Sequence, residues 1–240
     1  MPTAGRAAII AVFGSNDPRT LRPAEYVGYE IARQECILLT GGTDSAAAEV
    51  KEKAIAGVET APGARWIGVG RSKKIGRTVC SYQRIILWPG YVNKRNYVEA
   101  HLCDAAIAFL DGDGTASEVA FCLALGRPVI LVGEGWQTEY PLAYPQRERT
   151  LEKLRYQTLK RMQQDEVKPS PLDAPIATAV NSLSASLPSF AYRHLPQDGE
   201  ARRIVEHVLY LIGGAGRLGE FPNIARYSSM AADYHSWLGM

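Results

Sequence analysis

The stretch AAIAFLDGDGTASEVAFCLALGRPVILVGEG, residues 105–135, contains one complete unit of the predicted fold. It opens and closes with short apolar runs, 105–112 and 128–135, and each is typical of a strand that is buried on both faces. Between the runs, apolar residues recur at the spacing of one helix face, at Ala116, Val119, Ala120 and Leu123. A strand, a helix and a second strand in this order indicate two parallel strands joined by a helix.

The same alternation of strand and helix extends toward the N-terminus. Four further apolar runs have strand character and lie at 7–14, 36–42, 65–70 and 84–90. Helical spacing recurs between the first two runs, at Ala24, Val27, Gly28 and Ile31. We therefore predict the α/β class, with a doubly wound, Rossmann-like parallel sheet and helices on both faces.

The pattern becomes less regular after residue 134. Three later segments keep a recognisable period: a basic helix at 147–164, a strand at 189–195 and a helix at 199–212. We expect one Rossmann-like domain at 1–240, with an insertion at 134–188 and a C-terminal tail at 214–240. A lid and a subunit contact are equally good interpretations of the insertion.

Composition places the chain among globular proteins. Of its 240 residues 46% are apolar and 22% are charged, and 27 Lys and Arg against 25 Asp and Glu give a net charge of +2. A charge so close to balance argues against wholesale binding of nucleic acid or of a membrane surface. No apolar run approaches the ~18 residues of a membrane helix, and the first apolar run resembles a buried strand more than a signal peptide. We expect a cytoplasmic protein whose partner is a small molecule.

The sequence lacks the motifs that mark several common classes of enzyme. The absence of a GxGxxG fingerprint, Walker loop, GxSxG elbow or HExxH argues against NAD enzymes, P-loop NTPases, serine hydrolases and zincins. The four cysteines lie far apart and predict reduced thiols at Cys36, Cys80, Cys103 and Cys122. The four histidines have no metal-ligand spacing. We therefore expect neither a metal site nor a bound cofactor.

Ligands of doubly wound proteins bind beyond the carboxyl ends of the strands, where loops lead into helices. The loops at these positions are GSND (14–17), TGGTDS (40–45), PGYVNKRN (89–96) and DGDGTASE (111–118). Because these loops lie at one predicted edge of the sheet, we expect them to form one site. The predicted ligand-binding residues are Gly14, Ser15, Asn16, Gly41, Gly42, Thr43, Asn96, Asp111, Gly112, Asp113, Gly114 and Thr115.

Two interpretations of DGDGTASE remain open. Thr115 and Glu118 have the spacing of a capping box, in which two side chains bind backbone amides at a helix start. Alternatively, Gly112 and Gly114 leave the backbone open, so that the helix start binds an anionic group and Glu118 faces a sugar. The two aspartates of the same turn would repel a phosphate placed between them, which favours a neutral, hydroxyl-rich group there.

The segment NKRN, which begins at Asn93, places two cations at a helix start. Asn93 is a candidate N-cap for a helix that runs to about Cys103. Lys94 and Arg95 then fall in the first turn, where cations oppose the helix dipole. One interpretation is a solvated surface pair. The other is that Arg95 reaches an anionic ligand or Glu118, since a planar guanidinium holds phosphate or carboxylate in a fixed orientation.

These motifs make the chain similar to a known group of proteins. Residues 7–133 resemble the lonely-guy (LOG), or possible lysine decarboxylase, superfamily of Rossmann-like proteins, through GSND, LLTGGTDSAAAEVKEKAIAGV, KRN and GTASEVAFCLALGRPVILV in this order. The family pattern PGGxGTxxE reads LDGDGTASE here, with Leu110 and Asp111 in place of Pro and Gly. The Arg-Lys pair of the family's enzymes reads Arg95-Asn96, a form closer to molybdenum cofactor carrier proteins. The last stretch is also similar to nucleoside 2-deoxyribosyltransferases.

The resemblance implies a homodimer or higher homo-oligomer and three alternative functions. The first is phosphoribohydrolase activity, which cleaves the N-glycosidic bond of a nucleoside 5'-monophosphate with Arg95 and Glu118 as the catalytic pair. Glu118 would stabilise or attack an oxocarbenium-like sugar, while Arg95 would orient the ligand and keep Glu118 ionised. The second is a carrier or sensor that binds molybdenum cofactor or another phosphorylated ligand without chemistry. The third is a transferase in which Glu118 attacks the sugar.

Overall fold

The structure is a computed structural model of the chain. The residues that it describes are 6–14, 16–41, 49–70, 84–87, 94–109, 112–141, 146–163, 172–183, 189–192 and 194–214. Within these ranges, a seven-stranded sheet has the strand order β4-β3-β2-β1-β5-β6-β7, and every pair of neighbours is parallel. The strands are β1 (Ile9–Phe13), β2 (Ile37–Thr40), β3 (Trp66–Val69), β4 (Arg84–Leu87), β5 (Ala105–Phe109), β6 (Val129–Val132) and β7 (Ser189–Tyr192).

The order of the strands identifies the sheet as doubly wound. From β1 the chain builds outward to β4, and it then returns to place β5, β6 and β7 on the other side of β1. Ile10 of β1 is paired with Leu38 of β2 and with Ala105 of β5, so the direction of winding reverses between β1 and β5. The predicted α/β, Rossmann-like fold is confirmed, and this reversal point is where such sheets bind ligands.

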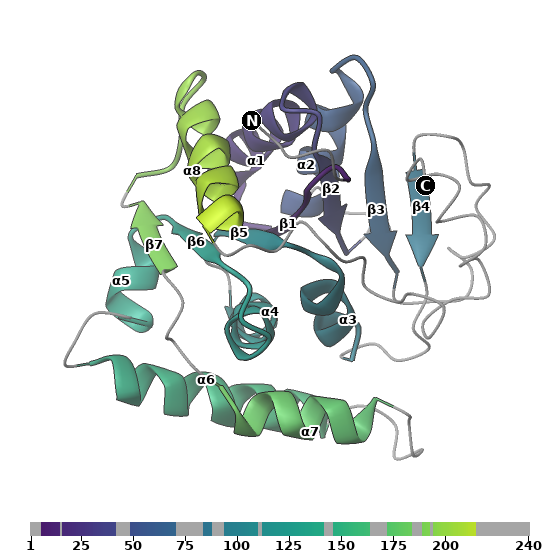
Figure 1. Cartoon of the computed structure of the whole chain (residues 1–240). Helices are drawn as coiled ribbons and strands as arrows, with labels where there is room; N and C mark the ends of the chain where they lie inside the picture. The colour runs from purple at the N-terminus through teal and green to yellow at the C-terminus, as the bar shows by residue number, and fades with distance from the viewer. Residues whose placement is uncertain are drawn as a thin grey trace.

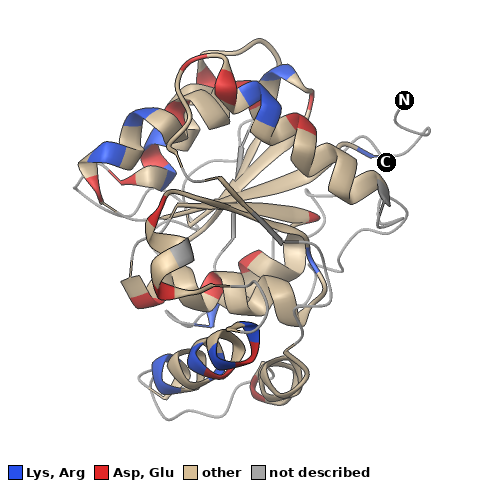
Figure 2. Cartoon of the chain, turned by 90° about the vertical axis from the view of Figure 1, so that its left-hand side faces the viewer, with Lys and Arg blue, Asp and Glu red and all other residues tan. Residues whose placement is uncertain are grey.

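Helices cover both faces of the sheet, as Figure 1 shows. One face carries α1 (Pro18–Arg33), α2 (Val50–Glu59) and α8 (Glu200–Gly214), and the other carries α3 (Arg95–Leu102) and α4 (Gly112–Ala124). The segment between β6 and β7 contains α5 (Gly135–Glu139), α6 (Arg147–Met162) and α7 (Asp173–Asn181). α6 and α7 pack against α4 and form an additional layer outside it. Figure 2 shows the strongly charged α6 beside a nearly uncharged α7.

The two-sided core explains why the strands are apolar throughout. In β1, Ile9, Ala11 and Phe13 belong to the core beneath α3 and α4. Ile10 and Val12 belong to the core beneath α1, α2 and α8. Successive side chains of a strand point to opposite faces, so a strand covered on both faces needs apolar residues at every position.

Two glycines allow α1 and α2 to pack with their backbones in contact. A Cβ atom at Gly28 would overlap the carbonyl oxygen of Ala54, and one at Gly57 would overlap the carbonyl oxygen of Glu25. Gly28 belongs to the apolar repeat that predicted α1, and the structure gives it a second role as a point of close approach. A larger side chain at either position would push the two helices apart.

The elements differ from the predicted ranges mainly at their ends. β1, β5 and β6 end at Phe13, Phe109 and Val132, before the glycines that the predicted runs included. α6 and α8 agree with the two predicted later helices to within two residues, and β7 ends three residues early. α2, α5 and α7 were not predicted individually. Four expectations stay predictions: the single domain, the insertion at 134–188, the tail at 214–240 and the homo-oligomer.

Three of the cysteines are buried free thiols, Cys36, Cys103 and Cys122, whereas Cys80 lies outside the described residues. Burial raises the pKa of the Cys36 thiol to about 12. In the part of the chain that the structure describes, no helix has the length and apolar character needed to cross a membrane. The cytoplasmic location stays a prediction.

Candidate functional site

The predicted loops converge on a cavity of about 350 Å³ at the carboxyl edge of the sheet. It lies at the ends of β1 and β2 and at the starts of α2, α3 and α4, and the last turn of α6 also contributes to it. The predicted residues that line it are Gly14, Gly41, Arg95, Asn96, Gly112, Asp113, Gly114, Thr115 and Glu118. Asn16 is exposed and is not among the lining residues. The other predicted positions, Ser15, Gly42, Thr43 and Asp111, lie outside the described residues.

Arg95 is buried at the start of α3, with 5% of its surface exposed. Its Nη1 donates a hydrogen bond to the carbonyl oxygen of Gly41 at 3.3 Å, and its Nε lies 3.6 Å from Oε1 of Glu99. A Cβ atom at Gly41 would lie 3.0 Å from Nη1 of Arg95, so a side chain there would crowd the guanidinium. The solvated-pair interpretation is therefore wrong for Arg95, which faces the site.

Lys94 is also buried, and it connects α3 to the outer layer of helices. Its Nζ lies 2.7 Å from Oδ1 of Asp173, at the start of α7. α3 begins at Arg95, with Lys94 at the N-cap position and no side-chain cap, while Asn93 lies outside the described residues. The predicted N-cap is thus one residue too early, and Lys94 fixes the docking of α7 instead of being solvated.

Glu118 on α4 faces charged groups from two other helices. It is only 8% exposed, and the charges of Glu99, Arg95 and Arg161 act on its carboxyl group. Burial raises the pKa of the Glu118 carboxyl well above its ordinary value, and Glu99 raises it further, against the opposite effect of the two arginines. Arg95 lowers the pKa of Glu118, in the predicted direction, while burial and Glu99 act in the opposite direction.

The start of α4 contradicts the capping-box interpretation. Thr115 would be the N-cap residue of that motif, but α4 begins at Gly112, so Thr115 already lies inside the helix. Gly112, the first residue of α4, has a φ of 63°, in the left-handed region that glycine adopts without strain. Glu118 is therefore positioned by its contacts with α3 and not by a cap.

Asn96 and Asp113 each form a side-chain hydrogen bond near the first turn of α4. Nδ2 of Asn96 donates a hydrogen bond to the carbonyl oxygen of Gly114 at 3.3 Å. Oδ1 of Asp113 accepts one from Nε2 of Gln157, on α6, at 3.1 Å. The amide hydrogen bond to Asp113 reduces the repulsion that this carboxylate would otherwise exert on an anion in the cavity.

Charged residues that line or neighbour the cavity without having been predicted are Glu49, Lys51, Glu99 and Arg161. Lys51, in the first turn of α2, lines the cavity and lies 3.2 Å from Oε2 of Glu49. Glu99 has the i, i+4 spacing to Arg95 that marks neighbours on a helix, a signal that was available in the sequence. Arg161 lines the cavity from α6, and no pattern distinguishes it from the other basic residues of that helix.

A larger cavity of about 500 Å³ lies beside the first, and the two share Gly112. It lies near the start of α1 and the end of β6, and its charged lining includes Arg19 and Glu134. Neither Arg95 nor Glu118 belongs to its described lining. The smaller cavity, which we call the Arg95–Glu118 cavity, is therefore the candidate site.

Comparison with known proteins identifies the family of the chain. A sequence model of the SLOG cluster4 family matches residues 7–167. No curated protein matches the chain. Among solved structures, the molybdenum cofactor binding protein from the phototrophic bacterium Rippkaea orientalis is 24% identical, with a TM-score of 0.53 over 85% of this chain and 98% of that one.

A second solved structure, the Moco carrier protein from Chlamydomonas reinhardtii, is 23% identical, with a TM-score of 0.52 over 85% of this chain and 99% of that one. At these identities the two structures establish a shared fold. The family match covers more than half of the chain and includes α3, α4 and the Arg95–Glu118 cavity. The chain therefore belongs to the SLOG cluster4 family, in agreement with its resemblance to LOG and molybdenum cofactor carrier proteins.

Proposed function

We propose that the chain binds a nucleoside 5'-monophosphate in the Arg95–Glu118 cavity and hydrolyses its N-glycosidic bond. The observation that carries this proposal is the convergence of Arg95 and Glu118, from two helices, in one cavity beside the reversal point of the sheet. The cavity of about 350 Å³ falls in the range of roughly 300–1,000 Å³ that small-ligand sites occupy.

The phosphate group has suitable partners in this cavity. Lys51 from α2 and Arg161 from α6 supply positive charge, and the first turn of α4 supplies backbone amides at the positive end of a helix dipole. With Arg95, these cations favour an anionic ligand over a neutral nucleoside. The hydrogen bond from Gln157 to Asp113 reduces the repulsion between the Asp113 carboxylate and a phosphate beside this turn.

The chemistry needs a group that protonates the departing base and then stabilises positive charge on the sugar. A carboxyl group with a raised pKa can do both, because it becomes negatively charged when it releases its proton. Glu118 has such a raised pKa, through its burial and through Glu99. In this proposal Glu118 is the acid, and Arg95 orients the ligand and later pairs with the Glu118 carboxylate.

A second candidate function is that of a carrier or sensor, which binds molybdenum cofactor or another phosphorylated ligand and performs no chemistry. Asn96 favours this candidate, because it stands where the related enzymes have lysine and its amide is bonded to Gly114. The site thereby has one cation fewer for catalysis. The two solved structures named above are a molybdenum cofactor binding protein and a Moco carrier protein, and their likeness to this chain concerns the fold.

One experiment separates these functions. The purified protein is incubated with nucleoside 5'-monophosphates and with the matching nucleosides, and free base is measured by chromatography. We expect base release from a monophosphate, and at least a ~100-fold slower release in Glu118→Gln. Glu152→Gln, an exposed change on α6, is the control and should keep the wild-type rate.

The remaining outcomes point to the other functions. Calorimetric binding of a monophosphate or of molybdenum cofactor without base release would contradict the hydrolase and support the carrier. Exchange of one base for another without net hydrolysis would instead support the transferase.

A further inference from the structure

The larger cavity of about 500 Å³, which we call the Glu134 cavity, has no role in the proposed function as stated so far. It adjoins the candidate site, and the two cavities share Gly112, the first residue of α4. A Cβ atom at Gly112 would have no atom of the described residues within 4 Å. Space is therefore open at the residue that the two cavities have in common, and a ligand can extend past it.

The two cavities lie on opposite sides of the reversal point of the sheet. The Arg95–Glu118 cavity is lined by Phe13 and Thr40, at the ends of β1 and β2. The Glu134 cavity is lined by Val132, at the end of β6, and β5 separates β6 from β1 in the sheet. Doubly wound sheets bind extended ligands across the reversal point, with one part on each half. The arrangement therefore suits a ligand that has two parts.

The start of α1, which also borders the Glu134 cavity, is already bound by a carboxylate. Oδ1 of Asp17 accepts a hydrogen bond from the Arg19 amide at 3.0 Å, and its Oδ2 lies 2.6 Å from Nη2 of Arg19. The side-chain and backbone hydrogen bonds from Arg19 lower the pKa of the Asp17 carboxyl, so it is ionised at neutral pH. Because Asp17 occupies the place where an anion would bind this helix, the phosphate belongs in the Arg95–Glu118 cavity.

The other charged groups of the Glu134 cavity are acidic. Glu134 and Glu139 line it and are exposed, as is His194, whereas the charge of Arg19 is paired with Asp17. Among the described residues, none forms a hydrogen bond or ion pair with the Glu134 carboxylate. An ionised carboxylate accepts hydrogen bonds and donates none. The cavity therefore suits a neutral group that has N–H donors and disfavours a second phosphate.

We propose that the Glu134 cavity holds the base of the nucleoside 5'-monophosphate, and that Glu134 selects bases with an exocyclic amino group. The identity of the ligand rests on the proposed function. The phosphate and the sugar lie in the Arg95–Glu118 cavity, and the base extends past Gly112. An amino group donates a hydrogen bond to a carboxylate, whereas an oxo group at the same place is an acceptor and is repelled.

The selection is tested by calorimetry with pairs of ligands that differ in one exocyclic group: cytidine and uridine 5'-monophosphate, and adenosine and inosine 5'-monophosphate. All proteins carry Glu118→Gln, so that hydrolysis does not consume the ligand. We expect the amino-bearing member of each pair to bind at least about fivefold more tightly.

Glu134→Gln should remove most of this preference, because an amide also donates to an oxo group. The control Glu152→Gln removes the same charge from an exposed position of α6 and should keep the preference. Equal affinities within both pairs, or a preference that Glu134→Gln leaves unchanged, would overturn the selection by Glu134.

The place of the base is tested by filling the cavity. Leu195 is half-buried in its lining, and Leu195→Trp occupies part of the space. We expect at least about tenfold weaker binding of the monophosphate and unchanged binding of ribose 5-phosphate, which has no base and shows that the variant is folded. Leu159→Trp, at an exposed position outside the described lining of both cavities, should bind both ligands like its parent. Unchanged affinity for the monophosphate in Leu195→Trp would place the base elsewhere.

The base site and the hydrolysis fail in distinguishable ways. If the protein binds amino-bearing monophosphates selectively but releases no base, the base site stands and the hydrolysis is wrong. If the wild type releases base at the same rate from both members of each pair, and Leu195→Trp does not slow it, the hydrolysis stands and the base site is wrong.

Discussion

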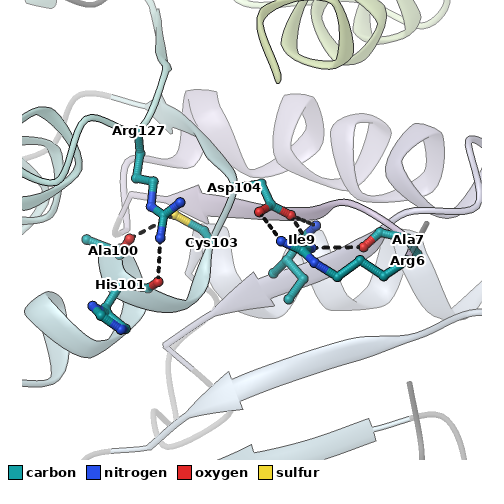
Figure 3. Close-up of polar contacts among 8 residues, drawn as sticks. All are labelled: Arg6, Ala7, Ile9, Ala100, His101, Cys103, Asp104 and Arg127. Atoms are coloured by element: carbon teal, nitrogen blue, oxygen red, sulfur yellow. Dashed lines mark hydrogen bonds and ion pairs between the residues drawn. The ribbon is translucent and has the colours of Figure 1, made fainter. Parts of the chain in front are cut away.

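At the amino edge of the sheet, Asp104 is bound by an arginine of its own and by the backbone, whereas at the carboxyl edge Glu118 shares Arg95 with a second acid. Both Nη atoms of Arg6 donate to the Asp104 carboxylate at 2.5 Å, and the Ile9 amide donates to it at 2.8 Å (Figure 3). These contacts connect β1 to the start of β5. At the amino edge, the charges of Arg6 and Asp104 pair with each other. At the carboxyl edge, Arg95 faces both Glu99 and Glu118, so a bound ligand would change the balance of charge there.

The two ends of α3 repeat this contrast. At its C-terminal end, Nη2 of Arg127 donates to the carbonyl oxygen of His101 at 3.0 Å (Figure 3), where a cation agrees with the helix dipole. At its N-terminal end, Arg95 opposes the dipole. The charges at the amino edge of the sheet thus stabilise the fold. At the carboxyl edge, where the candidate site lies, Arg95 is unfavourable for the helix that carries it.

The largest expected effect comes from Asp104→Asn, which removes the negative charge beside the buried Arg6. We expect a loss of about 3–5 kcal/mol in the free energy of unfolding at pH 7, because breaking a buried ion pair leaves a charge without compensation. Urea denaturation measures it. Arg6→Met combined with Asp104→Leu should regain part of the loss, since two apolar side chains leave no buried charge while the Ile9 amide loses its acceptor. A loss below about 1 kcal/mol in the single variant would show that the pair contributes no more than a surface ion pair.

The matched change at the other edge, Glu118→Gln, should have the opposite effect on stability. The folded protein binds the Glu118 proton more tightly than the unfolded chain does, because its pKa is raised by burial and by Glu99. Wild-type stability from this group is therefore full at low pH and is lost as the pH rises toward the raised pKa. Glutamine has no such loss.

The free energy of unfolding of Glu118→Gln should thus gain on that of wild type as the pH rises above the ordinary carboxyl range. The gain should be at most about 1.4 kcal/mol per pH unit for one proton. Urea denaturation at a series of pH values measures this difference. A difference that stays constant, or that shrinks as the pH rises, would contradict the raised pKa of Glu118.

Much of the fold and part of the site were predictable from the sequence, for physical reasons. Buried strands and helices must repeat apolar residues with their own periods, and parallel strands must end at one edge, so the proximity of Arg95 and Glu118 followed from topology. The capping-box interpretation failed because α4 begins at Gly112, so Thr115 lies inside the helix and not at its N-cap. The raised pKa of Glu118 depends on its burial and on Glu99, which no spacing along the chain reveals.

Arg161 gives the smallest of these effects and separates ligand binding from stability. It lines the cavity from α6, and a Cβ atom at Gly114 would lie 3.5 Å from its Nη2, so the guanidinium stands at the first turn of α4. We expect Arg161→Met to weaken binding of a nucleoside 5'-monophosphate about tenfold, through the loss of a charge-assisted hydrogen bond to phosphate, and to leave nucleoside binding nearly unchanged. Isothermal titration calorimetry measures both affinities.

The control for Arg161→Met is Lys160→Met, which removes the same charge from the adjacent, exposed position of α6. Equal weakening in both variants would mean that the net charge of α6 matters and that Arg161 makes no direct contact. In Lys160→Met the free energy of unfolding should change by no more than about 0.5 kcal/mol, since this side chain is exposed. Arg161 would then bind the ligand together with Arg95, and the site would include a residue from the helices between β6 and β7.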